Sequence, residues 1–531
     1  MIHGDILGER ARLSPERVAL VYVPTQQAFS YRELRDRALR CARLWLDQCH
    51  LVKGDRVGIL AMNRVEFLDA FFAAGATGVI LVPLNTRLTP AELGVVIEDS
   101  GLKALIYDGD LAGKVQQLKR EPSIELAIEH WIALDQRLDS SDLDYARWLS
   151  TLESSGWSAT PCDPEDIYCL LYTSGTTGKP KGVMIPHRMV AWNGYNTAVC
   201  WQLSENDVSP VFTPLYHAGG LAAFLVPIFI AGGTIVLHRD FDCDEVWTSI
   251  TRQKCTVVLG VPTIYKMLLD SPKFHEADLR CVRWFISGGA PLPVDLIEVY
   301  GKRGVILKQG YGLTEVGVNC FSMSSGEAVR KRGSIGKPMM FTQARLQDPE
   351  GNEVSNGQVG ELCLRGPHVC KGYWNNPSAT AAALDSDGWF HTGDLASCDA
   401  EGFFYIVGRS KDMFISGGVN VYPAEIEAEL LRCPGVGDAA VIGVAHAKWG
   451  EVGVAFVVPA GSVIPSADEI TNLLAEKLAK YKLPRDFVFV DALPRTPYGK
   501  VLKTELKELF ERRSRGDSTM RASGESGPET F

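Results

Sequence analysis

Several patterns that mark common binding sites are missing from the sequence, and each absence narrows the range of functions. The chain has no Cys-x-x-Cys pair, and none of its ten histidines forms a His-x-x-x-His pair, so no metal cage of usual spacing is predicted. The thirteen cysteines are odd in number and scattered. This usage is typical of reduced cysteines that act as small hydrophobic residues, and it favours a cytoplasmic location.

Clustered positive charge and long apolar spans are also scarce. A net charge of −10 argues against a dedicated nucleic-acid binder, so no nucleic-acid partner is expected. The one notable charge-free stretch, 218–237, is interrupted by Pro227 and by Gly232-Gly233. We therefore expect a buried helix, a glycine turn and a core strand there in place of a transmembrane segment. Peripheral membrane contact and the oligomeric state are left open.

What the sequence does contain is an alternation of strand and helix patterns. In the first third, strand patterns at 56–60, 79–82 and 104–107 alternate with helix patterns that begin after Ser30 and Thr89. Such alternation predicts βαβ units, and hence an α/β fold in which helices cover both faces of parallel sheets.

The length predicts more than one domain, because 531 residues exceed what one hydrophobic core usually spans. The character of the chain changes near Gly408, where a compact run of about 100 residues begins. We expect a large domain of βα-layered sheets at 1–407 and a smaller α+β domain at 412–511. The polar segment 512–531 is expected to form a disordered tail.

Three apolar strand patterns run into glycine-rich turns, at 169–178, 285–290 and 305–312. Ligands of open α/β sheets bind outside the carboxyl ends of strands, so these turns predict one shared crevice. The first turn combines glycines, which let backbone N–H groups face an anion, with hydroxyl and lysine side chains. It is not a Walker loop, because Pro180 follows Lys179. The predicted phosphate-binding residues are Thr173, Ser174, Gly175, Thr176, Thr177 and Lys181.

This turn resembles the phosphate loop of the adenylate-forming superfamily, which includes acyl-CoA synthetases, 4-coumarate ligases, luciferases and peptide-synthetase adenylation domains. Further blocks resemble the same family in the same order, and together they cover nearly the whole chain to about residue 510. These blocks lie at 214–220, 311–315, 390–394, 408–412, 417–418 and 494–500.

The resemblance implies an ATP-dependent acid–thiol ligase that forms an acyl-adenylate and pyrophosphate, and then an acyl-CoA thioester. ATP, Mg²⁺ and coenzyme A are the implied cofactor and co-substrates, with Glu315 on the metal and Thr314 at the α-phosphate. Asp394 and Arg409 are implied to hold the ribose, and Tyr311 to lie along the adenine. The remaining implied nucleotide-binding residues are Gly289, Gln309, Gly310 and Lys500.

Lys500 is the predicted catalytic lysine, because a positive charge near the α-phosphate stabilises the transition state of adenylation. The resemblance adds His217, Thr314 and Glu315 to the catalytic set, with His217 lining the acyl pocket. It also implies a hinge at 408–411, including Lys411, about which the small domain rotates. Gly417 and Gly418 then line the coenzyme A tunnel.

The identity of the acid is the least constrained prediction. Residues 221–224 contain no acidic side chain to pair with an ammonium group, which argues against an amino acid. The apolar stretch 218–224, with Gly219 and Gly220 leaving space beside His217, favours a medium- or long-chain fatty acid. The alternatives are an aryl acid of the coumarate or succinylbenzoate type, acyl transfer to a carrier protein, and a non-catalytic nucleotide-binding homologue.

Overall fold

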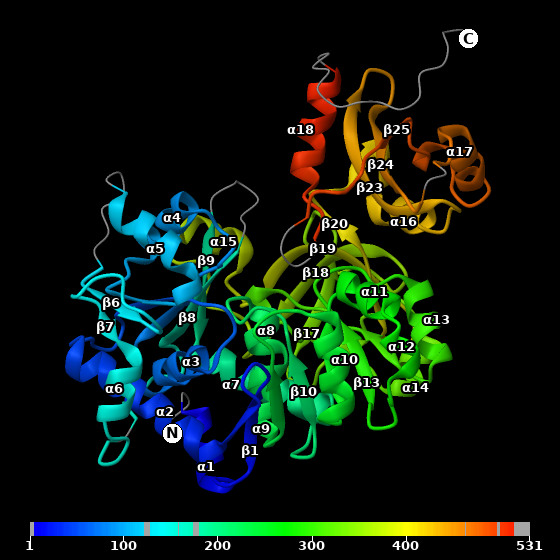
Figure 1. The fold of residues 1–531 in the computed structure, drawn as a ribbon. Coiled ribbons are helices and arrows are strands. Elements are labelled where there is room, and N and C mark those ends of the chain that lie inside the picture. The colour runs from blue at the N-terminus through cyan, green and yellow to red at the C-terminus, as the bar shows by residue number, and fades with distance from the viewer. Residues whose placement is uncertain are drawn as a thin grey trace. The chain divides into compact units, whose positions relative to one another are not determined.

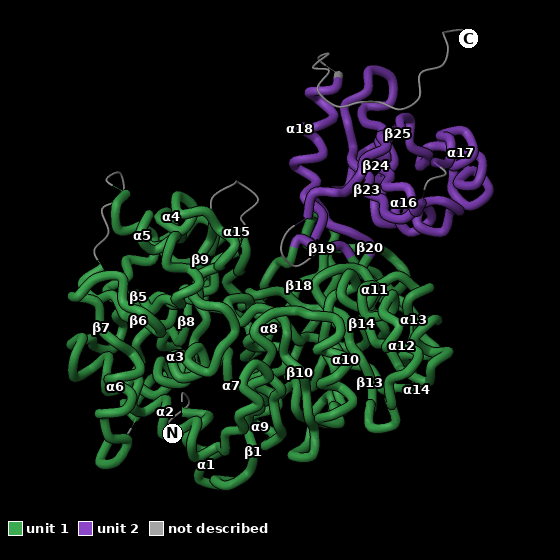
Figure 2. Tube along the Cα trace, viewed as in Figure 1, with its two compact units in different colours: residues 1–392, 396–406 green, residues 393–395, 407–531 purple. Residues whose placement is uncertain are grey.

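The computed structural model describes residues 5–121, 128–157, 159–173, 180–461, 464–495 and 500–514. The chain divides into two compact units (Figures 1 and 2). Unit 1 comprises the chain up to Thr392 together with Ala396–Ile406, and unit 2 comprises Gly393–Leu395 together with the chain from Val407 onward. The short piece Gly393–Leu395, which carries Asp394, therefore belongs to unit 2 although it lies ahead of the main boundary.

Unit 1 contains a seven-stranded sheet in the order β7-β6-β5-β3-β4-β8-β9. Neighbouring strands are parallel except for the antiparallel hairpin of β8 and β9. The strands are β3 (Arg56–Leu60), β4 (Ile80–Pro83), β5 (Ala104–Tyr107), β6 (His130–Ala133), β7 (Leu143–Asp144), β8 (Ile167–Thr173) and β9 (Lys181–Pro186). The three strand patterns predicted in the first third correspond to β3, β4 and β5.

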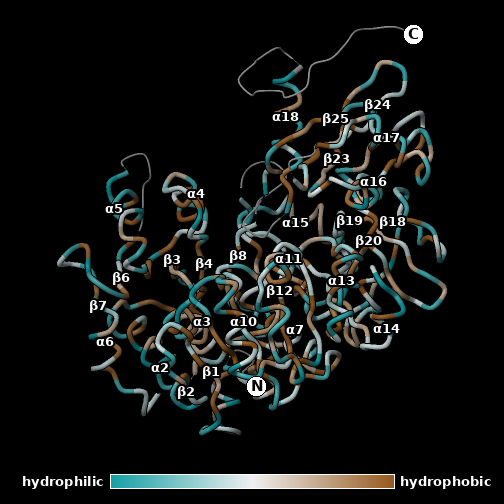
Figure 3. Tube along the Cα trace, turned by 45° about the vertical axis from the view of Figure 1, so that its right-hand side comes forward, coloured by the Kyte–Doolittle hydropathy of each residue, from teal (hydrophilic) through white to brown (hydrophobic). Residues whose placement is uncertain are grey.

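Helices cover both faces of this sheet because successive strand residues point to opposite sides. Ile59 packs in a cluster with Phe67 of α3 (Val65–Thr77), whereas Leu60 packs with Leu93 of α4 (Pro90–Ser100). A capping box opens α4 at Thr89, and another at Ser30 opens α2 (Tyr31–Arg43). The α/β fold class is confirmed, and hydrophobic residues follow the interior strands (Figure 3).

Two smaller sheets continue unit 1. One has the order β10-β11-β1-β2 and the other is parallel, with the order β12-β13-β14. Their strands are β1 (Val18–Tyr22), β2 (Gln27–Ser30), β10 (Val208–Val211), β11 (Thr234–Leu237), β12 (Val257–Gly260), β13 (Trp284–Ser287) and β14 (Leu307–Gln309). The helices α10 (Cys243–Arg252), α11 (Pro262–Asp270) and α13 (Val294–Lys302) pack on the second sheet through one hydrophobic cluster.

The charge-free stretch 218–237 is part of this core. It forms α8 (Ala218–Gly220), the π-helical turn η3 (Leu221–Leu225), α9 (Val226–Ala231) and strand β11. Gly232 ends α9 in the left-handed conformation, with φ of 87°. The predicted helix, glycine turn and core strand are confirmed, and every helix within the described ranges is too short or too polar to span a bilayer.

A further sheet has the order β17-β18-β19-β20. Its strands are β17 (Gln343–Gln347), β18 (Val359–Arg365), β19 (Phe390–Cys398) and β20 (Phe404–Arg409). The chain passes between the two units within β19 and again within β20. This sheet therefore carries the segments that connect unit 1 to unit 2.

Unit 2 is built on a five-stranded sheet in which β22-β21-β24-β23 are consecutive and β25 pairs with β24. The elements are β21 (Phe414–Ser416), β22 (Val419–Val421), α16 (Pro423–Leu430), β23 (Val436–His446), β24 (Gly450–Pro459), α17 (Ala467–Ala475), β25 (Asp486–Phe489) and α18 (Lys503–Ser514). Val441 of β23 packs with α16 and α17, whereas the next residue, Ile442, packs with Leu506 of α18. Helix α18 continues to Ser514, so the helical part of this unit ends three residues after the predicted boundary at 511.

Candidate functional site

The predicted phosphate loop connects β8 to β9. Thr173 and Lys181 are direct partners in the register of this hairpin, so they hold the two ends of the loop together. Residues 174–179, and with them Ser174, Gly175, Thr176 and Thr177, lie outside the described residues. The structure therefore describes the base of the predicted loop, with Lys181 at its exit.

A tyrosine that sequence analysis missed joins this loop to the predicted metal-binding glutamate. The hydroxyl of Tyr373 donates a hydrogen bond to Oε1 of Glu315 at 3.0 Å, and Nζ of Lys181 lies 5.2 Å from the centroid of the Tyr373 ring. The N–H of Cys370 also donates to the backbone carbonyl of Glu315 at 2.8 Å. The carboxylate of Glu315 is thereby placed beside the hairpin that carries the phosphate loop.

The segment around Tyr373 is aligned with β9 by backbone hydrogen bonds. The N–H of Met184 donates to the carbonyl of Gly372 at 2.9 Å, and the N–H of Trp374 donates to the carbonyl of Gly182 at 2.8 Å. In the sequence, the only local feature that marks this segment is the pair of aromatic residues that follows Gly372. Nothing in that signal indicates a contact with a residue 58 positions earlier.

The other two glycine-rich turns follow β13 and β14. Gly310 donates its N–H to the carbonyl of Ser287 at 2.7 Å, and the N–H of Leu292 donates to Oε1 of Gln309 at 3.2 Å. Gly289 has φ of 79°, a backbone conformation that favours glycine. These contacts bring the predicted nucleotide-binding residues Gly289, Gln309 and Gly310 together at the end of one parallel sheet.

The three turns, for which the sequence predicts one shared crevice, leave two different sheets. The first follows β8 of the seven-stranded sheet, and the other two follow strands of the three-stranded sheet. The turn after β14 continues into the 3₁₀ turn η4 (Thr314–Val316), which places Glu315 next to β9. In this turn Thr314 is buried, and the half-buried ring of Tyr311 packs edge-on against Phe321 with centroids 5.7 Å apart.

His217 caps the N-terminus of α8. Its Nδ1 accepts a hydrogen bond from the N–H of Gly219 at 3.2 Å, a contact that requires an unprotonated nitrogen. Burial of the ring lowers the pKa of His217 to about 4, even though the residue keeps some exposed surface. The imidazole is therefore neutral near pH 7.

The structure corrects the prediction that Gly220 leaves room for an acyl chain beside His217. A Cβ atom at Gly220 would lie 2.3 Å from the carbonyl oxygen of Pro214, so this glycine allows two backbone segments to approach closely. Phe224 is buried against Trp201 and Trp284, with ring centroids 5.6 and 5.9 Å away. Phe224 and its buried neighbours in the apolar stretch are thus part of the core. The stretch therefore gives no support for the prediction of a fatty acyl chain as substrate.

A second group of predicted residues lies in unit 2. Nε of Arg409 lies 2.8 Å from Oδ1 of Asp394, and the aspartate is buried, with 4% of its surface exposed. Desolvation, followed by the positive charges of Arg409 and Lys411, lowers the pKa of Lys500 to about 8, although the residue as a whole is exposed. Lys500 therefore interacts electrostatically with this ion pair, although 91 positions separate it from Arg409 in the sequence.

The two glycines predicted to line the coenzyme A tunnel form the turn between β21 and β22. Gly417 and Gly418 have φ of 60° and 82°, a region of backbone conformation that favours glycine. The N–H of Gly417 donates to the carbonyl of Trp449 at 2.8 Å, and a Cβ atom at Gly417 would lie 3.1 Å from the Trp449 ring. A close approach to Trp449 is therefore one reason for a glycine at this position.

Comparison with known proteins matches both parts of the chain to one family of enzymes. Residues 7–374 match the family described as AMP-binding enzyme, and residues 425–500 match the AMP-binding enzyme C-terminal domain. The chain is 40% identical over 501 residues to a feruloyl-CoA synthase of Amycolatopsis, which covers 94% of this chain and 97% of that protein. It is 37% identical over 512 residues to a long-chain-fatty-acid–CoA ligase of Mycobacterium tuberculosis, covering 96% and 98% of the two chains.

A solved structure shares the fold over most of its length. The o-succinylbenzoate coenzyme A synthetase of Bacillus subtilis, in complex with its acyl-adenylate intermediate, superposes with a TM-score of 0.83 at 34% identity. The match covers 95% of this chain and 98% of that one. The described geometry and these matches over nearly the full length lead to one conclusion: the chain belongs to the AMP-binding enzyme family and is an acid–thiol ligase.

Proposed function

We propose that this ligase activates an aryl-substituted carboxylic acid with ATP and transfers the acyl group to coenzyme A. In the first step, a carboxylate oxygen attacks the α-phosphorus and pyrophosphate leaves, which forms an acyl-adenylate. In the second step, the thiol of coenzyme A attacks the acyl carbon, the thiol proton is released, and AMP leaves. The observation that carries the proposal is the cluster of Lys181, Tyr373 and Glu315 at the base of the predicted phosphate loop.

The predicted nucleotide-binding residues have the chemistry that a nucleoside triphosphate needs. Lys181 and Thr173 supply a positive charge and a hydroxyl at the two ends of the loop, and we assign Ser174, Gly175, Thr176 and Thr177 to the phosphates as well. Gly289, Gln309, Gly310 and Tyr311 are assigned to the adenine side, and Thr314 to the α-phosphate. The buried carboxylate of Asp394, oriented by Arg409, is assigned to the ribose hydroxyls.

Glu315 fits the Mg²⁺ ion that we assign to this site. Its carboxylate is a hard oxygen donor oriented by the Tyr373 hydroxyl, and Mg²⁺ is commonly held by one or two carboxylates together with phosphate oxygens. When bound, the ion neutralises phosphate charge and orients the departing pyrophosphate. The contribution of this chain is to hold the Glu315 carboxylate in position.

Lys500 is assigned to the transition state of the first step. Its lowered pKa reflects partial desolvation and the like charges of Arg409 and Lys411, and a positive charge at this position can stabilise the charge of a phosphoryl group. We further propose that unit 2 rotates about the hinge at 408–411, which contains Lys411, after adenylation. Gly417 and Gly418 would then face coenzyme A, and neutral His217 would line the acyl site without adding a charge beside the thioester.

An aryl acid is preferred because the chain is 40% identical to a feruloyl-CoA synthase. In addition, the structure explains Gly220 by close backbone packing, so this glycine no longer supports a pocket for a fatty acyl chain. A medium- or long-chain fatty acid is the second candidate, since a fatty-acid ligase is 37% identical over 96% of the chain. The acceptor is proposed to be coenzyme A in preference to a carrier protein, because both relatives are named for coenzyme A. The scattered free thiols support a cytoplasmic location.

Acid-dependent release of AMP and pyrophosphate tests this function directly. Purified protein is supplied with ATP, Mg²⁺ and coenzyme A, together with ferulate, coumarate, succinylbenzoate or a saturated fatty acid. We expect thioester formation with at least one aryl acid at a higher kcat/KM than with any fatty acid. A higher kcat/KM for a fatty acid selects the second candidate, whereas nucleotide binding without turnover on any acid contradicts both.

A further inference from the structure

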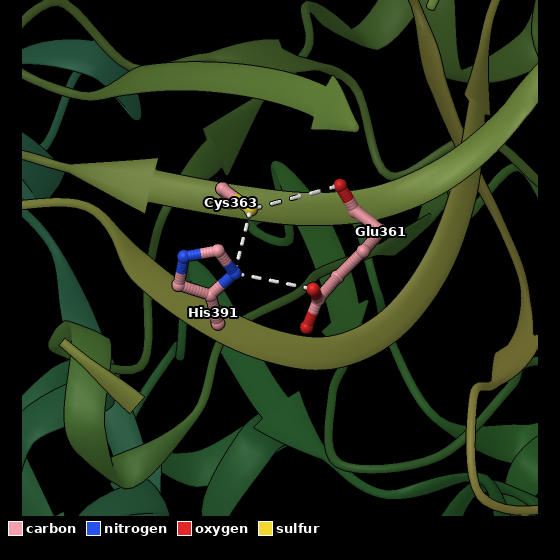
Figure 4. Close-up of side chains that lie close together, drawn as sticks. All are labelled: Glu361, Cys363 and His391. Carbon is pink, nitrogen blue, oxygen red and sulfur yellow. Dashed lines mark hydrogen bonds and ion pairs between the residues drawn. The ribbon is translucent and has the colours of Figure 1, made fainter. Parts of the chain in front are cut away.

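Three side chains of different chemistry converge on the β17–β20 sheet, at a place that the adenylation mechanism does not use. Glu361 and Cys363 lie two residues apart on one face of β18, and His391 lies beside them on β19 (Figure 4). Nδ1 of His391 is 3.1 Å from Oε2 of Glu361 and 3.5 Å from Sγ of Cys363. Among the described residues, this is the one group of three that offers ligand atoms all within 4.8 Å of one another.

We propose that Glu361, Cys363 and His391 bind a zinc ion. Thiolate sulfur, imidazole nitrogen and carboxylate oxygen are the three protein ligands that zinc uses. With zinc–ligand bonds of about 2.0–2.3 Å, tetrahedral geometry places nitrogen about 3.5 Å from sulfur and about 3.4 Å from oxygen. The observed separations of 3.5 and 3.1 Å already approach these values, so small side-chain rotations suffice to form the site.

The charges around the cluster also suit a divalent cation. A cysteine thiolate and the Glu361 carboxylate together balance two positive charges, which matters at a partly buried site. Arg345 lies opposite Cys363 in the strand register, but its guanidinium is paired with Asp385 at 3.3 Å and lies 4.2 Å from the Trp389 ring centroid. The arginine charge is therefore shared with a carboxylate and an aromatic face.

The second ring nitrogen of His391, Nε2, lies near a carboxylate, which is the usual partner of a metal-bound histidine. Oδ2 of Asp385 lies 3.8 Å from Nε2 of His391, on the opposite side of the ring from Cys363 and Glu361. This separation is longer than a hydrogen bond, so the side chains must rotate slightly before the carboxylate accepts the Nε2 proton, which keeps Nδ1 available for the metal and strengthens the imidazole as a ligand. Asp385 thus acts as a positioning residue for the proposed ligand His391.

Access and geometry favour a metal site over a nucleophilic cysteine. The side chains of Glu361 and His391 are 30% and 31% exposed, so an ion can enter from solvent. Cys363 has no exposed surface, which prevents a substrate from reaching its sulfur. The cysteine and the glutamate both face the same nitrogen of His391, as ligands of one ion do, whereas a catalytic triad uses the two ring nitrogens separately.

A bound ion would connect β18 to β19 next to an existing contact, in which the Thr392 hydroxyl donates to the carbonyl of Leu362 at 2.6 Å. His391 lies three positions before Asp394, where the chain has passed into unit 2. We therefore assign the ion the role of linking β18 to β19, with solvent in the fourth position that the three side chains leave open, and binding should raise the thermal unfolding temperature of the full chain as the zinc concentration rises.

Titration of the chelator-treated, full-length protein tests the site without nucleotide. Isothermal titration calorimetry with Zn²⁺ should give one tight site per chain, and Co²⁺ should produce a thiolate-to-cobalt charge-transfer band. Cys363→Ala should abolish that band, and His391→Gln should weaken Zn²⁺ binding in a second, independent variant. Asp385→Asn should lower the Zn²⁺ affinity by about 10- to 100-fold while keeping the cobalt band.

Two matched control variants distinguish metal binding at this site from binding at another cysteine or at the proposed Mg²⁺ site. Cys398→Ala removes a cysteine of the neighbouring strand β19 and should leave the band and the affinity unchanged. Glu315→Gln alters the proposed Mg²⁺ site and should also leave both unchanged, so failure of the nucleotide site does not affect the result. Absence of the cobalt band in the wild-type protein, its persistence in Cys363→Ala, or its loss in either control overturns the proposal.

Discussion

The Tyr373 hydroxyl lies 3.0 Å from Oε1 of Glu315, and the ring of the same tyrosine lies 5.2 Å from the Lys181 ammonium. One aromatic side chain therefore contacts both a carboxylate and a cation. In the proposed function the carboxylate binds the metal and the ammonium binds a phosphate, so Tyr373 lies between the two groups that act on the nucleotide. We propose from this arrangement that Tyr373 has a positioning role in binding of the metal–nucleotide complex.

Tyr373→Phe removes the hydrogen bond and keeps the ring beside Lys181. A hydrogen bond to a charged group contributes about 1.5–3 kcal/mol, so we expect the Mg²⁺ concentration for half-maximal adenylation to rise about tenfold or more. The rate at saturating Mg²⁺ should fall much less. Pyrophosphate release measured across a Mg²⁺ titration gives both quantities.

Tyr405→Phe is the matched control, because this tyrosine of β20 also points its hydroxyl at a carboxylate, Asp399, at 3.5 Å. It should leave the Mg²⁺ dependence unchanged. An equal shift in both variants, or a loss of rate in Tyr373→Phe that saturating Mg²⁺ does not restore, would contradict the positioning role.

Local signals in the sequence predict the elements of the fold that local chemistry determines. The capping residues Ser30 and Thr89 start α2 and α4 as predicted, because a cap satisfies N–H groups within one turn of itself. The strand expected at 305–307 instead begins at Leu307, since the N–H of Val305 is still bonded to the carbonyl of Tyr300 at the end of α13. Boundaries shift in this way when neighbouring elements compete for the same backbone groups.

Contacts between distant segments are where sequence reasoning fails. Glu315 is predicted from a family motif, but its partner Tyr373 depends on how segment 370–374 pairs with β9. Gly220 is interpreted as open space in the sequence, whereas the structure places the Pro214 carbonyl against it. The Glu361–Cys363–His391 cluster has no metal-site spacing, because β18 and β19 bring its members together only in the folded sheet.

Lys500→Ala should separate the two half-reactions. Loss of a positive charge aimed at the developing transition-state charge should lower acyl-adenylate formation by at least about 10²–10³-fold. Conversion of supplied acyl-adenylate to thioester should continue, because the proposed second step does not use this lysine. Single-turnover assays of each step measure the separation, with Lys507→Ala of α18 as an exposed control. Equal loss in both steps would contradict the proposed rotation of unit 2.

Gly220→Ala tests whether this glycine is needed for packing. The added Cβ would meet the Pro214 carbonyl oxygen at 2.3 Å, so backbone segments must move and the cost should be about 1–3 kcal/mol. We expect a lower thermal unfolding temperature and reduced activity with short and bulky acids alike. Gly301→Ala in α13, where nothing lies within 4 Å of the new Cβ, is the control. A loss of activity confined to long-chain acids would instead support the prediction that Gly220 leaves room for an acyl chain.

Lys308→Met should stabilise the protein in a pH-dependent way. Lys308 is buried, with 9% of its surface exposed, and desolvation lowers its pKa to about 8 from the 10.5 of an exposed lysine. Below about pH 8 both the folded and the unfolded chain carry the charge, so the folded state bears the full desolvation cost, which is about 3 kcal/mol for such a shift. As pH rises from 8 to 10.5, the folded state loses its proton first and the cost disappears.

The contacts of Lys308 determine how much of that cost the substitution recovers. Its ammonium donates to the carbonyl of Met323 at 3.0 Å and lies 4.8 Å from the Trp284 ring centroid, and both contacts are lost in the variant. We therefore expect a gain of about 1–2 kcal/mol in the free energy of unfolding near pH 7, falling to zero or to a loss at about pH 10. Chemical denaturation at the two pH values, with Lys302→Met on the exposed end of α13 as the control, measures the difference. A gain of equal size at both pH values would mean that the introduced methionine side chain packs better for reasons unrelated to charge.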